Sequence, residues 1–433
     1  MSTLIAAERR ARVPLRDRFG LPDTRGNRPL LGAATIDSLG TGLVLAFVVV
    51  YFATTTTLPL AEVGAALTLA RLLASPTAVV VGPLIDRFGA RRVALAGNAV
   101  SAVAYAGFLV VGSRFWEIVP VAWAAQVGAV TYWTSSTGLV ALAARPDGRP
   151  RWFALLHTLR NAGLAAGGAL GAFAVGAGGV TGLRAAVLAN AVSYVIAALL
   201  LARWRPADAS PLRRDAGQRS GRSGGRSTER DAGPDVAAAG YRRVLRDRRY
   251  LLLIAVNLTL VLPSLVLSLL LAVFVTQGLH RPAWIAGALL VANGAQVVLT
   301  QTWVTGRLAR HRSSRVVAWG AALYALAFAV FAMLPGAPGW AVVVGLVVAG
   351  GVYNLAETVA TPFQEELSVA LAPADLRGRY LAVYQLSWTA GQTAAPALFT
   401  LLAAHGAALP WLFLVLLCGV SVLLLGRLAR AHR

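Results

Sequence analysis

Residues 82–92 read Gly-Pro-Leu-Ile-Asp-Arg-Phe-Gly-Ala-Arg-Arg and form a short, basic break between two long apolar runs, 60–81 and 93–112. Each run is long enough to cross a bilayer as a helix, which takes about 20 apolar residues. Gly82 would let two helix ends approach closely, and Asp86 can accept hydrogen bonds from the positive N-terminus of a helix. The segment therefore predicts a tight connection between two membrane helices, with its arginines at the membrane surface.

Apolar runs of this kind continue along the whole chain and give twelve candidate spans. They cover residues 31–53, 60–81, 93–112, 117–141, 153–176, 183–202, 250–275, 283–305, 316–334, 339–361, 380–402 and 408–427. Strict alternation of apolar and polar residues is rare in them, so we do not expect a membrane β-barrel. The predicted fold class is an all-α membrane protein.

The composition excludes several classes of protein. Of the 433 residues, 57% are hydrophobic and 13% are charged, whereas soluble domains carry about 25% charged residues. The single cysteine, Cys418, excludes a disulfide framework and a cysteine-based metal site. The sequence has no Walker A pattern, no His-Glu-x-x-His and no convincing catalytic triad. We therefore expect no enzyme activity, no cofactor, no metal and no catalytic residue.

The arginines predict the orientation of the chain. With twelve alternating spans and a cytoplasmic N-terminus, 35 of the 40 basic residues, all arginines, fall on the cytoplasmic side. The opposite side carries only Arg114, Arg184 and Arg281. This asymmetry follows the positive-inside rule and predicts a multi-pass protein of the plasma membrane with both termini in the cytoplasm. Basic loops beside a lipid surface explain the net charge better than nucleic acid does, so we expect membrane lipids, and no nucleic acid, as partners.

The chain divides into two halves around a Gly-, Ser- and Arg-rich segment. The predicted parts are a cytoplasmic tail (1–30), a first six-helix bundle (31–203), a disordered linker (204–248), a second bundle (249–427) and a short tail (428–433). The linker's composition is that of a solvated tether that also attracts anionic lipid, and binding of RNA or protein is the alternative.

The two halves repeat each other. Asp147, Arg149 and Arg151 precede the fifth span, and Asp375, Arg377 and Arg379 precede the eleventh at a constant offset of 228 residues. Two parallel repeats of six spans predict two pseudo-symmetric six-helix bundles with a substrate cavity between them near the middle of the membrane.

With this architecture, the chain resembles the major facilitator superfamily over nearly its whole length. Residues 82–92 match the family pattern G-x-L-[AS]-D-[RK]-x-G-[RK]-[RK] except at Ala90. The resemblance implies that this segment controls opening toward the cytoplasm. The gating residues that it implies are Gly82, Asp86, Arg87, Gly89, Arg91 and Arg92.

Two further stretches bear on the type of transporter. Gly163, Gly167, Gly168 and Gly171 in the fifth span resemble the glycine signature of the family's antiporters, although small residues four apart also serve simple helix packing. In the fourth span, the arginine of the R-x-x-Q-G signature is replaced by Trp123, which puts proton coupling by that position in doubt.

Charged residues inside spans are costly, by at least about 2.5–3.5 kcal/mol at a helix centre, and are therefore functional candidates. Four fall inside or near spans: Asp37, Arg71, Arg160 and Glu357. The hypothesis is that Asp37 alternates between protonation and pairing with Arg71 or Arg160. A permanent ion pair is the alternative. Glu357 is a candidate second proton or cation site, unless it reaches the cytoplasmic surface, which the predicted span places about one turn away.

Polar and aromatic stripes on several spans are candidates for the substrate cavity, although helix packing explains each of them as well. These residues are Trp123, Gln126, Trp133, Asn257, Asn293, Gln296, Tyr353, Asn354, Gln385 and Trp388. A cavity lined this way suits a lipophilic molecule better than a phosphorylated one.

The sequence therefore predicts a monomeric secondary transporter that exports small, lipophilic organic molecules by alternating access, in exchange for protons. Two alternatives stay open. One is an importer or facilitator of a sugar or metabolite with the same fold, and the other is a membrane scaffold or sensor that transports nothing.

Overall fold

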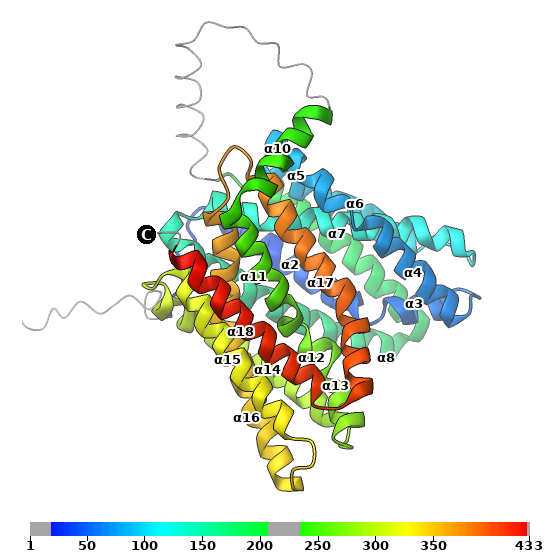
Figure 1. Cartoon of the computed structure of the whole chain (residues 1–433). Helices are drawn as coiled ribbons and strands as arrows, with labels where there is room; N and C mark the ends of the chain where they lie inside the picture. The colour runs from blue at the N-terminus through cyan, green and yellow to red at the C-terminus, as the bar shows by residue number, and fades with distance from the viewer. Residues whose placement is uncertain (1–18, 207–233, 431–433) are drawn as a thin grey trace, which may run out of the picture.

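The computed structural model describes residues 19–206 and 234–430, and the regular structure in these two ranges is entirely helical (Figure 1). The N-terminal group of helices comprises α2 (Arg28–Leu45), α3 (Val48–Thr55), α4 (Leu60–Ala74), α5 (Thr77–Phe88), α6 (Ala90–Phe108), α7 (Phe115–Ala143), η1 (Pro146–Gly148) and α8 (Arg149–Arg203). The C-terminal group comprises α10 (Pro234–Arg246), α11 (Arg248–Ser264), α12 (Val266–Leu269), α13 (Leu271–Val273), η2 (Phe274–Gly278), α14 (Trp284–Leu308), α15 (Ser313–Met333), α16 (Gly339–Ala370), α17 (Arg377–His405) and α18 (Leu409–Arg430).

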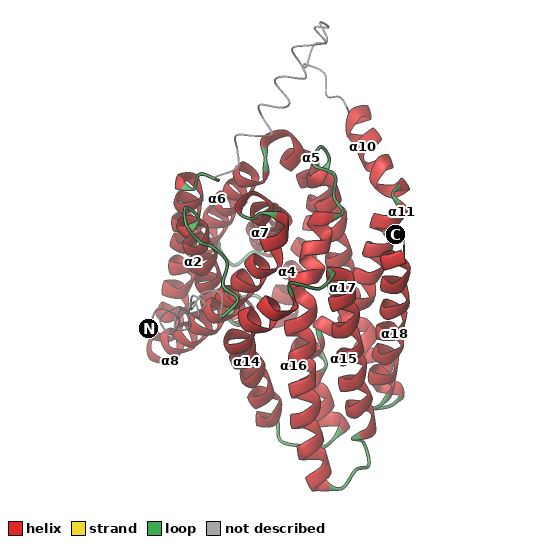
Figure 2. Cartoon of the chain, turned by 90° about the vertical axis from the view of Figure 1, so that its left-hand side faces the viewer, coloured by secondary structure: helices red, strands yellow, loops and turns green. Residues whose placement is uncertain are grey.

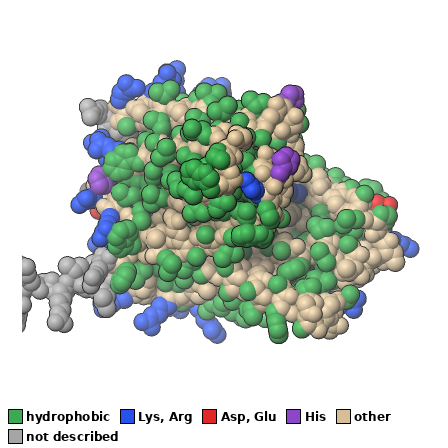
Figure 3. Space-filling model, turned by 90° about the horizontal axis from the view of Figure 1, so that it is seen from below, with side chains coloured by type: hydrophobic (Ala, Val, Ile, Leu, Met, Phe, Trp, Pro, Cys, Tyr) green, Lys and Arg blue, Asp and Glu red, His purple; other side chains and the backbone are tan. Residues whose placement is uncertain are grey.

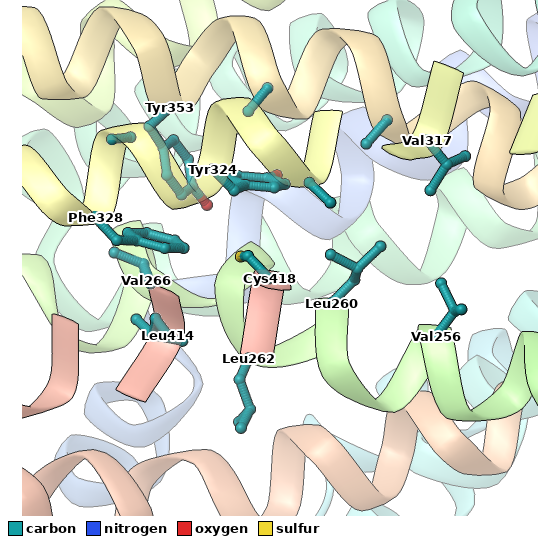
Figure 4. Packing of buried hydrophobic residues seen from close by; sticks show 14 of the residues in the cluster. Val256, Leu260, Leu262, Val266, Val317, Tyr324, Phe328, Tyr353, Leu414 and Cys418 are labelled. Atoms are coloured by element: carbon teal, nitrogen blue, oxygen red, sulfur yellow. The ribbon is translucent and has the colours of Figure 1, made fainter. Parts of the chain in front are cut away.

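Each group has an apolar core of its own. The core of the C-terminal group is built around the rings of Tyr324, Phe328 and Tyr353, with Cys418 beside them (Figure 4). The N-terminal group holds two clusters, one that includes Trp152 and another that includes Phe52. The Trp152 cluster also includes Val369 on α16 and Leu381 on α17, so the two groups share apolar contacts there.

Several predicted spans are bent or broken. The first is formed by α2 and α3, which meet at 49°, and the second by α4 and α5, which meet at 42°. The predicted fifth and sixth spans run together in α8 with a break at Gly179, whose φ of 52° is favourable only for glycine. The predicted seventh span, 250–275, is also broken: α11 ends just after Pro263 and short segments follow, since proline disrupts a helix interior. Arg248–Leu269 is nevertheless long and apolar enough to cross a bilayer.

The tenth predicted span, 339–361, ends too early. Helix α16 continues through Pro362 to Ala370, because Phe363 and Leu367 are buried and Gln364 donates a hydrogen bond of 2.6 Å to Asn257. The polar residues that follow the apolar run 339–361 therefore belong to the helix and not to a loop.

The described helices are those of a multi-pass membrane protein. Six of them are long and apolar enough to cross a bilayer, and counting each bent pair as one span raises the number to eight. Seen from below, the protein shows mostly hydrophobic and uncharged side chains, and most of the visible basic side chains lie toward the rim (Figure 3).

Part of the predicted linker is a helix. Within 204–248, the structure describes α10 over Pro234–Arg246, so the expectation of disorder throughout was wrong there. A proline in the first turn and a run of alanines favour this helix. Helix α10 lies just before α11 and projects beyond the bundle (Figures 1 and 2), and residues 207–233 lie outside the described part.

Candidate functional site

The basic segment 82–92 joins the two groups of helices. The Asp86 carboxylate accepts hydrogen bonds from the Gly378 backbone N–H, at 2.5 Å, and from Arg379 Nη1, at 2.8 Å. Both side chains of the ion pair are about one-tenth exposed. Asp86 thus lies at the N-terminus of α17, where a carboxylate is favourable. We call the end of the protein that is formed by the connections with most arginines the arginine-rich end. The contact of Asp86 with α17 closes this end.

Helix α10 adds a second set of contacts at the same end. The Tyr241 hydroxyl donates a hydrogen bond of 2.5 Å to the backbone carbonyl of Val79 in α5, and it lies where a side chain at Gly82 would be. Arg243 forms an exposed ion pair of 3.0 Å with Asp375. The end of the linker therefore bridges the N-terminal group and the start of α17.

The remaining predicted gating residues fix the segment within its own group. Gly89 has a φ of 84°, a conformation that favours glycine at a tight turn. Arg91 binds the final carbonyls of α8, those of Leu201 (2.8 Å) and Ala202, which suits a cation at a helix C-terminus. Arg87 packs over the ring of Phe88, and Arg92 is exposed.

Asp37 is buried inside the N-terminal group. Its side chain on α2 is 7% exposed, and its Oδ1 atom has no hydrogen-bond partner. No described basic residue lies within the 4.0 Å of an ion pair with it. The charge of Arg160 on α8 acts on it, as do the phenols of nearby tyrosines. A carboxylate without a firm partner in an apolar interior has a strong reason to take up a proton.

The structure separates the two predicted partners of Asp37. Arg160 stacks over the Trp133 ring, with its guanidinium carbon 3.9 Å from the ring centroid. Arg71 instead donates a hydrogen bond of 2.9 Å to the Gln392 amide oxygen on α17, across the two groups. In this conformation, Asp37 forms an ion pair with neither arginine, and Arg160 is its electrostatic neighbour.

A small cavity lies between the two groups and brings Arg160 together with residues that the sequence did not single out, among them His157 and Glu365. It has room for about one water molecule and is lined by Ser136, Thr137, Val140, Phe153, Leu156, His157, Arg160 and Glu365. Glu365 on α16 also interacts electrostatically with Arg160, and the His157 Nδ1 atom lies 3.2 Å from Gln301 Oε1 on α14. The sequence signal that could have indicated Glu365 was the pair Glu365 and Glu366 after an apolar run. The predicted tenth span, 339–361, ended before this pair.

The glycine signature packs α8 against α2, the helix that carries Asp37. Side chains at Gly163, Gly167 and Gly171 would meet backbone atoms of α2, whereas a Cβ at Gly168 would find its nearest neighbour 3.9 Å away. Three of the four glycines therefore allow a close helix approach, as the packing alternative holds.

Four of the predicted polar residues form one network between α14 and α16. Asn293 Nδ2 donates to Glu357 Oε2 at 2.7 Å and to Asn354 Oδ1 at 2.9 Å, and Asn354 Nδ2 donates to Gln296 Oε1 at 3.2 Å. Glu357 lies near the middle of α16, roughly 20 Å from its C-terminus at 1.5 Å per residue. The expectation that it lies one turn from the surface was wrong, because α16 runs on to Ala370.

Two of the predicted cavity residues belong to the core instead. Asn257 is fully buried and donates a hydrogen bond of 2.6 Å to Ser387. Tyr353 is 1% exposed and its hydroxyl donates to the Pro263 carbonyl at 3.1 Å. Their polar atoms are used up by structural contacts, so a substrate has little to bind there.

The other predicted cavity residues keep some exposure. Trp123, Gln126 and Trp133 are exposed on one side of α7, where Trp133 carries the Arg160 guanidinium. Gln385 and Trp388 are half-buried on α17, with Trp388 against the core of the C-terminal group.

Comparisons with known proteins agree with this arrangement. An Na⁺, Li⁺, K⁺/H⁺ antiporter of Planococcus maritimus is 24% identical over 402 residues, which cover 86% of this chain and 88% of the relative. A class G tetracycline resistance protein of Vibrio anguillarum is 33% identical over 144 residues, covering 32% of this chain and 35% of the relative.

The fold is that of solved transporters. A crystal structure of a bacterial homologue of the iron transporter ferroportin, in an outward-facing state, matches 94% of this chain and all of the homologue with a TM-score of 0.72 and 17% identity. The family model of the Major Facilitator Superfamily matches residues 30–367. This chain therefore belongs to the Major Facilitator Superfamily and is a membrane transporter.

Proposed function

We propose that this protein exports small, lipophilic organic molecules across the plasma membrane in exchange for protons. The substrate would bind between two six-helix bundles, formed by twelve spans, and reach either side of the membrane by alternating access. The arginine-rich end would face the cytoplasm, with both termini on that side.

The observation that carries the proposal is the buried, unpartnered Asp37 carboxylate with Arg160 as its electrostatic neighbour. Protonation of Asp37 would remove the negative charge that attracts Arg160. Arg160 also interacts electrostatically with Glu365 on the other group. One proton would thus alter a contact between the two groups, and differential binding of this kind is all that a coupled cycle requires.

The closed arginine-rich end supports a state that is open on the opposite side. Asp86 and Tyr241 join the groups at that end, and Arg243 holds α10 to Asp375, just before α17. Export would require these contacts to break, admit the substrate from the cytoplasm and form again.

Two features support a lipophilic substrate and efflux. The exposed side of α7 offers the indole rings of Trp123 and Trp133, which suit planar organic molecules. The similarity to a tetracycline resistance protein covers a third of the chain and favours export over import.

Transport in proteoliposomes tests the proposal. Purified protein should release a fluorescent lipophilic dye against its gradient when a pH gradient is imposed, and Asp37→Asn should abolish that response. Glu62→Asn is a matched control, because Glu62 is an exposed acid in the first turn of α4. Equal pH-driven transport by wild type and Asp37→Asn would refute the role of Asp37, and uptake along a sugar gradient without any pH effect would favour a facilitator. No solute movement under any gradient would favour a scaffold.

Exchange of an alkali cation for protons is a second candidate function. The relative that matches 86% of this chain is an Na⁺, Li⁺, K⁺/H⁺ antiporter. Acidification of proteoliposomes on addition of Na⁺ or K⁺, without organic substrate, would establish it.

A further inference from the structure

The carboxylates of Asp37 and Glu357, one in each group, have opposite surroundings. Asp37 is under the influence of Arg160. No described arginine or histidine lies within 4.0 Å of Glu357, and no basic group contributes to its electrostatics. Carboxylates in different environments take different tasks. Proton exchange suits Asp37, and the role of Glu357 needs an explanation of its own.

The surroundings of Glu357 consist of neutral amides and phenols. Asn293 uses both hydrogens of its amide nitrogen to hold Glu357 and Asn354. Tyr324 on α15 and Tyr353 on α16 are the titratable groups that face Glu357, and both are neutral phenols in a packed core. An ionised carboxylate in such a place lacks the counter-charge that would make it stable.

The atoms that this network leaves free are acceptors. The Glu357 Oε1 and Asn293 Oδ1 atoms have no hydrogen-bond partner among the described residues. The Glu357 side chain as a whole is half-buried. One negative charge beside a neutral oxygen attracts a cation and repels an anion.

The depth of the network matches that of a substrate site. Asn293 and Gln296 lie near the middle of the 25-residue helix α14, and Glu357 lies near the middle of α16. Both of these helices also contact α8, the helix of Arg160. Sites in transporters of two repeats lie at this level.

We propose that Glu357, held by Asn293, Asn354 and Gln296, binds the positive charge of a monovalent cation that this protein transports. The single carboxylate selects one positive charge, since divalent ions require more charged oxygens and the described residues contain no cluster of three His, Cys, Asp or Glu. The cation is either an alkali ion or a lipophilic organic cation. The inference rests on the proposed transport function and adds the substrate's charge.

Binding to the purified protein in detergent tests the inference without transport. The probes are Na⁺, K⁺, tetraphenylphosphonium and tetraphenylborate, the last two being nearly identical in shape and opposite in charge. We expect wild type to bind at least one of the cations, and Glu357→Gln to weaken that binding at least tenfold. Tetraphenylborate should bind wild type and variant equally. Selective loss of Na⁺ or K⁺ binding identifies an alkali ion, and loss of tetraphenylphosphonium binding identifies an organic cation.

A matched control and a stability measurement separate function from folding. Glu366→Gln removes an acid from the same helix, outside the network, and should bind as wild type does. Glu357→Gln should melt at the same temperature as wild type or higher, because it removes an uncompensated charge. If Glu357→Gln does not fold, Asn293→Ser should weaken the same cation, since it removes the amide that holds the carboxylate.

Unchanged cation affinity in Glu357→Gln, or in Asn293→Ser as its substitute, overturns the inference, as does a wild type that binds only the anion. Failure of the transport function is distinguishable. Cation binding that depends on Glu357, with no solute movement in proteoliposomes, would leave the binding site in place and refute transport. Dye export that survives Glu357→Gln with the same cation preference would leave the transport function in place and refute the binding role of Glu357.

Discussion

Replacement of Asp86 by Asn should open the arginine-rich end. The carboxylate joins α5 to α17 through the Gly378 N–H and the Arg379 guanidinium, and its side chain is only about one-tenth exposed. Asn keeps an oxygen for Gly378 but loses the ion pair. A hydrogen bond to a charged group contributes about 1.5–3 kcal/mol, and solvent screens this one little.

We therefore expect Asp86→Asn to weaken the closed state by about 2 kcal/mol, which changes the ratio of closed to open molecules by roughly 30-fold. The matched control is Asp375→Asn, which removes the exposed ion pair with Arg243, whose side chains are 60% and 62% exposed. Exposed pairs contribute about 0–1 kcal/mol, so this control should change the ratio by less than about fivefold.

Spin labels on the two groups measure this ratio directly. Asp147 before α8 and Arg310 after α14 are exposed positions at the arginine-rich end, and cysteines there can be labelled because Cys418 is fully buried. Double electron–electron resonance should show a new population at longer distance in Asp86→Asn. A distance distribution unchanged from wild type, or no greater change than in Asp375→Asn, would refute the gating role of Asp86.

Three further predictions follow from the contacts. Tyr241→Phe removes the hydrogen bond from α10 to Val79 and should raise the open population two- to tenfold in the same spin-label experiment, since a hydrogen bond contributes about 0.5–1.5 kcal/mol. No change would mean that α10 does not hold the groups together. Gly167→Leu should prevent folding, because any side chain there meets the backbone of α2, whereas Gly168→Ala should melt within a few degrees of wild type; gel filtration and thermal melting decide, and equal behaviour of the two would contradict the packing account. Cys418 should resist a hydrophilic maleimide in the folded protein and react after denaturation, and rapid labelling of the native protein would show that the core of the C-terminal group is open.

Much of the candidate site could be located, although not assembled, from the sequence. Asp37, Arg160 and Glu357 were identifiable because a charge in an apolar run is rare and costly. Glu365 was missed because hydropathy falls at Pro362, and that measure does not register that α16 continues. Arg71 was a plausible partner for Asp37 by depth alone, and only the direction of its side chain, toward Gln392, excluded it.

The sequence by itself determined the helical membrane class, the division into halves and the bias of the arginines to one side, because hydropathy and charge act locally through transfer into lipid. It also marked residues 82–92 as a special connection. Only the tertiary structure decided that Asp86 binds a helix almost 300 residues further along the chain, that Arg160 lies between the carboxylates of two groups, and that Glu357 lies deep in its helix. The physical reason is that such contacts depend on how each helix is rotated, bent and packed against distant partners, and a local pattern of apolar residues does not encode that rotation.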